Sequence, residues 1–77
     1  MTSTAKIQVF EGQMIIETYY RIVTHQGAFD ALATVIAELK ETTYKNQVRS
    51  TFHNPGNRSA NLYLDDGRII VFIQILV

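Results

Sequence analysis

The segment 68–77, with the sequence RIIVFIQILV, decides the fold because it is apolar at almost every position. Alternate side chains of a β-strand point to opposite faces of the sheet. One face of this segment carries Ile69, Val71, Ile73, Ile75 and Val77, and the other carries Ile70, Phe72 and Leu76. A strand that is apolar on both faces is typical of a strand buried on both faces. The segment is therefore expected to lie inside a sheet that is covered on each side.

Four other segments have the alternation or the β-branched and aromatic content of strands. Three turn signals separate them: Glu11-Gly12, the run Asn54-Pro55-Gly56-Asn57-Arg58, and Asp65-Asp66-Gly67. Glycine supplies the positive φ that tight turns require, and in the Pro55 turn it is expected to do so at Gly56. The four predicted strands are 5–10, 13–24, 45–53 and 60–64.

A single helix is predicted over residues 28–41. Its apolar residues recur at helical spacing. Four alanines flank this stripe, which suits close approach to a sheet, and Asp30 and Lys40 lie where the helix dipole favours them. The apolar stripe consists of Phe29, Leu32, Val35, Ile36 and Leu39, and the alanines are Ala28, Ala31, Ala33 and Ala37.

These elements predict an α+β fold in the order β-β-α-β-β-β, with a five-stranded, mostly antiparallel sheet and one helix packed on one face. The 77 residues are expected to form one small domain, with residues 1–4 frayed. One helix covers only one face of a sheet, so a partner must cover the other. We expect that partner to be a second copy of the chain, in a homodimer joined face to face or by the sheet edges.

Composition excludes several kinds of site. The chain has no cysteine and only two histidines, which argues against disulfides, a thiolate metal site and a histidine metal cage. Its net charge is zero, whereas general nucleic-acid binders usually carry a basic excess. Neither a signal peptide nor a membrane span is recognisable, so a cytoplasmic protein without a cofactor is expected.

The long strand 13–24 offers two faces. Met14, Ile16, Tyr20 and Ile22 form one face, which we predict to point into the core. Residues on the other face are mixed in character, as protein interfaces are, and include Ile15, Tyr19 and Val23. The predicted partner face combines that second set with the last strand, and consists of Ile15, Tyr19, Val23, Ile70 and Phe72.

A polar segment near the middle of the chain suggests a different activity. Basic residues two positions apart on a strand, followed by an asparagine-rich basic loop, could follow a phosphate backbone. We favour a solvent-exposed strand face beside a hairpin loop as the explanation of the same residues, because the net charge of the chain is zero. The possible nucleic-acid or ligand patch consists of Lys45, Arg49, His53, Asn57 and Arg58.

The two histidines are the remaining candidates for chemistry. His25 and His53 both lie at predicted strand ends, and if strands 13–24 and 45–53 run in the same direction they fall at the same end of the sheet. Such a pair could serve a metal-independent hydrolase or nuclease, but only within hydrogen-bond distance. The alternative is two ordinary surface or loop histidines.

Taken together, the sequence favours a non-enzymatic protein-interaction or regulatory module, such as an inhibitor, adaptor or assembly factor, that acts as a homodimer. The alternatives are a nucleic-acid-binding dimer that uses the polar segment 45–58 and a small histidine-dependent hydrolase or nuclease. No motif in the chain names a reaction or a cofactor.

Overall fold

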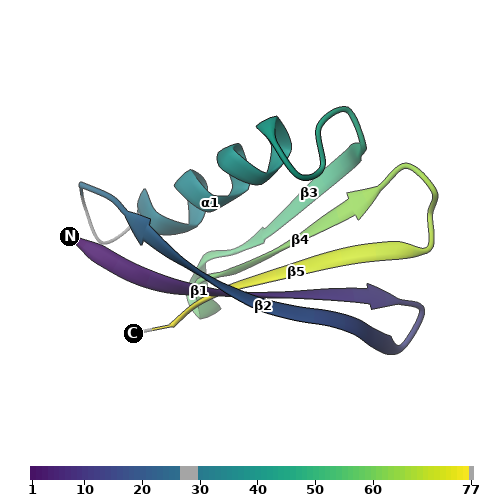
Figure 1. The fold of residues 1–77 in the computed structure, drawn as a ribbon, viewed down its shortest axis with the longest axis horizontal. Coiled ribbons are helices and arrows are strands. Elements are labelled where there is room, and N and C mark those ends of the chain that lie inside the picture. Colours follow the sequence, from purple (N-terminus) through teal and green to yellow (C-terminus); the bar gives the residue numbers. More distant parts are fainter. Residues whose placement is uncertain (27–29, 77) are drawn as a thin grey trace.

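The computed structural model of the chain describes residues 1–26 and 30–76 and contains one twisted sheet with one helix (Figure 1). Ala28 and Phe29 of the predicted helix and Val77 of the predicted last strand lie outside the described residues. The elements are β1 (Thr2–Glu11), β2 (Met14–Thr24), α1 (Asp30–Glu41), β3 (Val48–Asn54), the 3₁₀ turn η1 (Pro55–Asn57), β4 (Ser59–Leu64) and β5 (Ile69–Leu76).

The strands form a single antiparallel sheet in the order β2-β1-β5-β4-β3. The predicted α+β class and element order are therefore confirmed. β5 is the central strand, with β1 and β4 on either side of it. β2 and β3 form the two edges, and α1 connects one edge to the other across one face (Figure 1).

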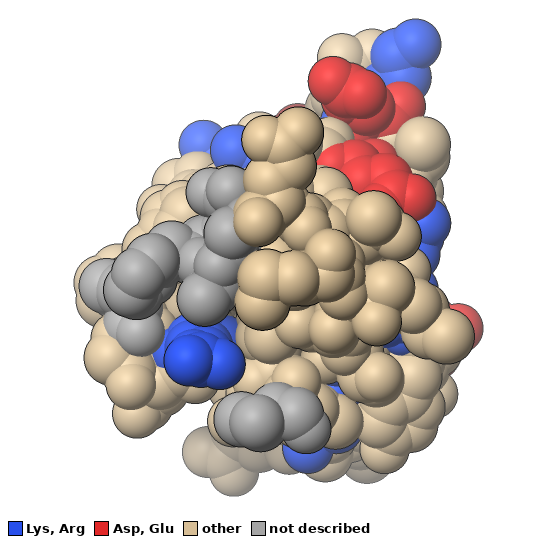
Figure 2. All heavy atoms as spheres, turned by 90° about the vertical axis from the view of Figure 1, so that its left-hand side faces the viewer, with Lys and Arg blue, Asp and Glu red and all other residues tan. Residues whose placement is uncertain are grey.

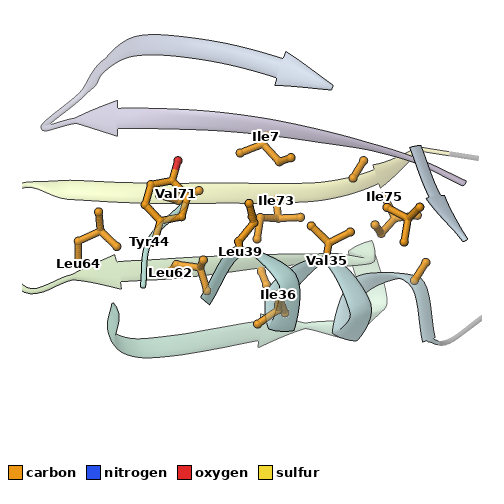
Figure 3. Packing of buried hydrophobic residues seen from close by; sticks show 14 residues of the cluster. Ile7, Val35, Ile36, Leu39, Tyr44, Leu62, Leu64, Val71, Ile73 and Ile75 are labelled. Carbon is orange, nitrogen blue, oxygen red and sulfur yellow. The ribbon is translucent and has the colours of Figure 1, made fainter. Parts of the chain in front are cut away.

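The core lies between α1 and the face of the sheet that it covers. Alternate residues of β1, β4 and β5 are buried there, as period-two alternation requires. The helix contributes its stripe at positions 31, 35, 36 and 39, of which Leu39 is fully buried (Figure 3). Of the helix alanines expected to approach the sheet, Ala31 is buried, but Ala33 and Ala37 are exposed. The sheet residues of the core are Ala5, Ile7, Val9, Val23, Ala60, Leu62, Leu64, Val71, Ile73 and Ile75.

Two of the predicted glycine turns have the expected backbone, and the third does not. Gly12 and Gly67 have φ angles of 62° and 74° in the hairpin turns β1-β2 and β4-β5. In the turn between β3 and β4, the left-handed residue is Arg58, with φ of 51°, and Gly56 lies outside that region. The turn begins with a short 3₁₀ segment instead of the predicted proline–glycine turn, which moves the reversal two residues along the chain.

The prediction that residues 1–4 are frayed is wrong for Thr2, Ser3 and Thr4. All three are in β1 and pair with β2. The backbone N–H of His25 also donates to the carbonyl of Met1, at 2.9 Å. Backbone pairing with the long β2 edge therefore orders residues whose own composition carries no strand signal.

The predicted division of β2 between its two faces is also wrong. A β-bulge at Ile16 shifts the register, so that Val9 pairs with Glu17 and Phe10 with Ile15. Beyond the bulge, Tyr20 and Ile22 point away from the helix and are 60% and 79% exposed. Tyr19, Arg21 and Val23 lie on the helix-covered face.

This assignment predicts that two neighbouring substitutions in β2 change the stability by very different amounts. Val23→Ala should lower the free energy of unfolding by about 2 kcal/mol, because it removes two buried carbon atoms. Ile22→Ala should change it by less than about 0.5 kcal/mol, because that side chain is exposed. Urea unfolding followed by circular dichroism in dilute protein compares the two variants. A larger loss for Ile22→Ala than for Val23→Ala would reverse the assignment of the faces.

Candidate functional site

No element of the described residues covers the sheet face opposite α1, and we call this face the open face (Figure 1). Its residues alternate with the buried ones along each strand, and the strand registers place them in rows across the sheet. From edge to edge, the open face carries Ile15, Thr18, Tyr20 and Ile22 on β2; Thr4, Lys6, Gln8 and Phe10 on β1; Ile70, Phe72, Gln74 and Leu76 on β5; Ser59, Asn61 and Tyr63 on β4; and Ser50, Phe52 and Asn54 on β3.

Aromatic and aliphatic side chains dominate this face. Tyr20 and Phe52, on the two edge strands, are 60% and 58% exposed. Phe10, Phe72 and Tyr63 are half-buried on the three inner strands. Contiguous apolar surface of this kind on a small protein marks an interaction site.

The open face is almost without charge. Lys6 is the one residue of those listed above that carries a formal charge. Acidic residues lie elsewhere, on α1 at Glu38 and Glu41 and in the β4-β5 turn at Asp65 and Asp66. Figure 2, which views the molecule from the side of the chain termini, shows acidic groups near the top and separate basic groups over the rest of that surface. Depletion of charge with enrichment in aromatic residues is the composition of an interface core.

A shallow hollow of about 340 Å³ lies near the middle of the open face. Phe72 on β5 stands between two carboxamides, Gln8 on β1 and Asn61 on β4, which are its direct register partners. The Asn61 amide lies at 3.5 Å from the hydroxyl of Tyr63, a long contact that leaves both groups available to a partner. The hollow suits an apolar or aromatic side chain with a polar tip. Its lining consists of Gln8, Phe10, Gly12, Asn61, Ile70 and Phe72.

Three of the five residues predicted for the partner face lie on the open face: Ile15, Ile70 and Phe72. Tyr19 and Val23 do not, which corrects that part of the prediction. Val23 is 3% exposed in the core. The hydroxyl of Tyr19 is 3.2 Å from that of Tyr44, which follows α1, so its polar end is satisfied on the helix side.

Sequence reasoning missed several residues of the open face. The predicted partner face omits Gln8, Phe10, Phe52 and Tyr63, and the predicted phase of β2 puts Tyr20 in the core. The available signal was the alternation in β1, where Phe10 falls in phase with Lys6 and Gln8 and out of phase with the buried Ile7 and Val9.

The structure does not bring the polar segment together as one patch. Lys45 precedes β3, in a turn whose Gln47 carbonyl accepts from the N–H of Asp65. Arg58 lies at the opposite end of the sheet, where its carbonyl accepts from the N–H of Ile75. β3 separates the two by seven residues, or about 23 Å. Arg49 lies at a β-bulge within β3, and His53 and Asn57 lie at its far end; all three are exposed.

The two histidines lie at opposite edges of the sheet. β2 and β3 run in the same direction and end at the same side, but three strands separate them. Four strand spacings amount to about 19 Å, far beyond hydrogen-bond reach. His25 is buried, and its Nε2 is 2.8 Å from Ser3 Oγ, whereas His53 is exposed. The arrangement provides no acid–base pair.

Within residues 1–26 and 30–76, no group of three or more histidine, cysteine or acidic side chains is placed to hold a metal ion. The same residues include no helix with the length and hydropathy of a membrane span. Comparison with known proteins gives no further guide, because no family model, curated protein or solved structure matches the chain. Functional inference therefore rests on the open face itself.

Polar groups on the covered face are paired at the margin of the helix. Arg21 on β2 forms a salt bridge with Glu38 on α1, and Tyr19 meets Tyr44 just beyond the helix. Both members of the salt bridge are about a third exposed or more, which limits its contribution to stability. Burial raises the pKa of Tyr44 well above its usual range, and the hydrogen bond with Tyr19 adds to the shift. These pairs close the covered face and leave the open face as the surface free to act.

The raised pKa of Tyr44 predicts how stability depends on alkaline pH. A tyrosine that resists ionisation in the folded state contributes stability that is fully present below its unfolded pKa of about 10. Above that pH the unfolded chain ionises first, so the free energy of unfolding should fall. Tyr44→Phe should remove most of this fall and change little at neutral pH. Denaturant unfolding of both proteins from pH 8 to pH 11 measures the difference, and parallel curves would contradict the assignment.

Proposed function

We propose that the chain is a non-enzymatic protein-interaction module that works as a homodimer through its open face. The observation that carries this proposal is a broad sheet face with five aromatic side chains and one charge, opposite a face that the helix already covers.

The size of the open face supports a partner as large as a protein. Five strands at about 4.8 Å spacing, each with about seven residues at 3.3 Å, give a face on the order of 550 Å² in projection. Side-chain relief makes the accessible area larger than that projection. Stable protein interfaces bury about 800 Å² on each partner, and transient ones bury less. The open face therefore matches an interface at the lower end of the standard range.

Its charge supports a second copy as that partner. A two-fold interface brings identical patches together, so a strongly charged patch would repel itself. The open face has Lys6 as its single charge, and its other polar groups are amides and hydroxyls, which pair with their own kind. A nucleic-acid surface instead needs several cations along one track. The basic residues Lys45, Arg49 and Arg58 do not supply that track because they are spread along the β3 edge.

A dimer of this form would leave two copies of α1 on its outer surfaces. Each copy presents the acidic residues Glu38 and Glu41 and the basic residue Lys40, so the charged surface is doubled. A regulatory partner, as in an inhibitor, adaptor or assembly factor, would then dock on this doubled outer surface. A cytoplasmic location remains the prediction from the sequence.

The test is the oligomeric state of matched variants, measured by light scattering behind size-exclusion chromatography over a concentration series. The native chain should elute as a dimer. Phe72→Glu should shift it to a monomer, because it places a carboxylate at the centre of the open face, while Ala33→Glu on the exposed side of α1 should stay dimeric. Phe10→Glu provides a second face variant, and circular dichroism verifies that each variant is folded.

Two results would overturn the proposal. One is a native chain that stays monomeric at every concentration, and the other is a dimer that survives both Phe72→Glu and Phe10→Glu. A monomer that binds a single-stranded oligonucleotide, with an affinity that falls steeply with salt, would favour the nucleic-acid alternative instead. In that case the aromatic residues of the open face would act as a base-stacking surface.

A further inference from the structure

We infer that the second copy packs with its β5 on β5, around a two-fold axis that runs along this central strand, so that β1 of each copy faces β4 of the other. The inference rests on the proposed homodimer and specifies its geometry. It follows from the order of side chains across the open face, because side chains of similar type lie on β1 and β4, on either side of β5.

The symmetry is visible in the three rows that cross the inner strands. In two rows the residue on β1 and the residue on β4 have the same chemical character, and in the third both are polar, although Lys6 is charged and Ser59 is only 4% exposed. Two carboxamides flank Phe72, two aromatic rings flank Ile70, and two polar groups flank Gln74. The rows are Gln8–Phe72–Asn61, Phe10–Ile70–Tyr63 and Lys6–Gln74–Ser59.

Rotation by 180° about β5 exchanges β1 with β4 and keeps every residue in its row. Phe72 then faces Phe72 of the second copy, and Phe10 faces the second copy's Tyr63. Gln8 faces Asn61 across the interface, where two amides can exchange hydrogen bonds. Lys6 faces Ser59 of the second copy, and the two lysines stay about 10 Å apart in the plane of the sheets, or two strand spacings. Aromatic groups thus meet aromatic groups, and polar groups meet polar groups.

This arrangement also accounts for the hollow. Each hollow extends along β1 beside Phe10 and Gln8, and those are the positions over which Tyr63 of the second copy is placed. A tyrosine has an apolar ring for the side chains of Phe10 and Ile70 and a hydroxyl for the amide of Gln8. Tyr63 is therefore the anchor that each copy inserts into the hollow of the other.

A two-fold axis across the strands is less favourable. It would keep each strand facing itself and exchange neighbouring rows, so that Gln74 would lie on Phe72 and Lys6 on Gln8. The Gln74 carboxamide would then be buried against the Phe72 ring without a matched partner, which costs free energy. Both axes keep the strands of the two sheets aligned, so the matching of side chains is what favours the axis along β5.

Cysteine crosslinking distinguishes these axes, and the chain has no native cysteine to interfere. Thr18 on β2 and Phe52 on β3 are exposed and lie in the row of Phe72, at opposite edges. Facing sheets are about 10 Å apart, so a short bis-maleimide reagent is used instead of a direct disulfide. Thr18→Cys and Phe52→Cys are purified separately, treated alone and after mixing, and analysed by intact mass.

The inference predicts a crosslinked heterodimer in the mixture, in an amount close to the fraction of heterodimers that random mixing of the two variants gives. Either variant alone should show little crosslinking. In the proposed dimer, two copies of Thr18 are about 19 Å apart, whereas Thr18 faces Phe52 of the second copy. Tyr20→Cys with Asn54→Cys repeats the test one row away, in case the loss of the Phe52 ring weakens the dimer. Phe72→Cys should crosslink to itself, because Phe72 lies on the axis.

Strong crosslinking of Thr18→Cys alone would overturn the inferred axis, since it would place β2 against β2. The homodimer itself would still stand in that case, with a different axis or an edge-to-edge pairing. Absence of any dimer by light scattering would instead reject the proposed function. The two failures are therefore separate.

Discussion

The structure depends on an imbalance between one short helix and a five-stranded sheet. α1 has twelve residues and lies on one face, where it buries the alternate side chains of β1, β4 and β5. No second layer exists for the other face in the described chain, yet β5 places Ile70, Phe72 and Leu76 there. A chain of this size has little stability to spare, and it has no disulfide to compensate for exposed apolar surface.

The two faces differ in how most of their polar groups are satisfied. On the covered face, Arg21 forms a salt bridge with Glu38 and the Tyr19 hydroxyl pairs with that of Tyr44, whereas the buried hydroxyl of Thr51 has no hydrogen-bond partner among the described residues. On the open face, the Lys6, Gln8 and Gln74 side chains form no hydrogen bond with the described residues. Groups left in this condition beside aromatic rings are available to a partner. This difference supports the open face as the surface for the proposed association.

Much of the fold could be predicted from the sequence, because the periodicity of the apolar residues and the residues typical of turns indicate the strands and the helix. The apolar residues on both faces of β5 predicted a strand with two faces to cover, but they did not predict the strand order that places β5 at the centre. Alternation could not reveal the bulge at Ile16, which reverses the phase of β2, and both phases of that strand are similarly apolar. Glu38 and Tyr44, whose contacts with Arg21 and Tyr19 show which face of β2 is covered, lie about 20 residues further along the chain. They become neighbours of β2 only in the folded state.

For the same reason, only part of the candidate site could be predicted from the sequence. Ile15, Ile70 and Phe72 were found because apolar residues in excess of one core face indicate a second buried surface. Gln8, Asn61 and Tyr63 gain meaning only from the register that puts them beside Phe72 or Phe10, and register between distant strands is a tertiary property. The polar segment 45–58 stays a prediction, because its side chains are spread along the length of the β3 edge and are not gathered at one point.

Edges and face together explain why association should occur through the face. Both edge strands carry a bulge, at Ile16 in β2 and near Arg49 in β3, and β3 is only seven residues long. Bulges and short strands are devices that prevent edge-to-edge pairing. The open face lacks any comparable protection except Lys6, and one lysine does not prevent association but restricts it. In the proposed dimer, this ammonium group would lie near the margin of the inner strands, from which a long lysine side chain can reach solvent, and a shifted packing would bury it against Phe10 or Phe72 at a cost in free energy. A single charge on an otherwise neutral face would then favour one arrangement of the two copies over its neighbours.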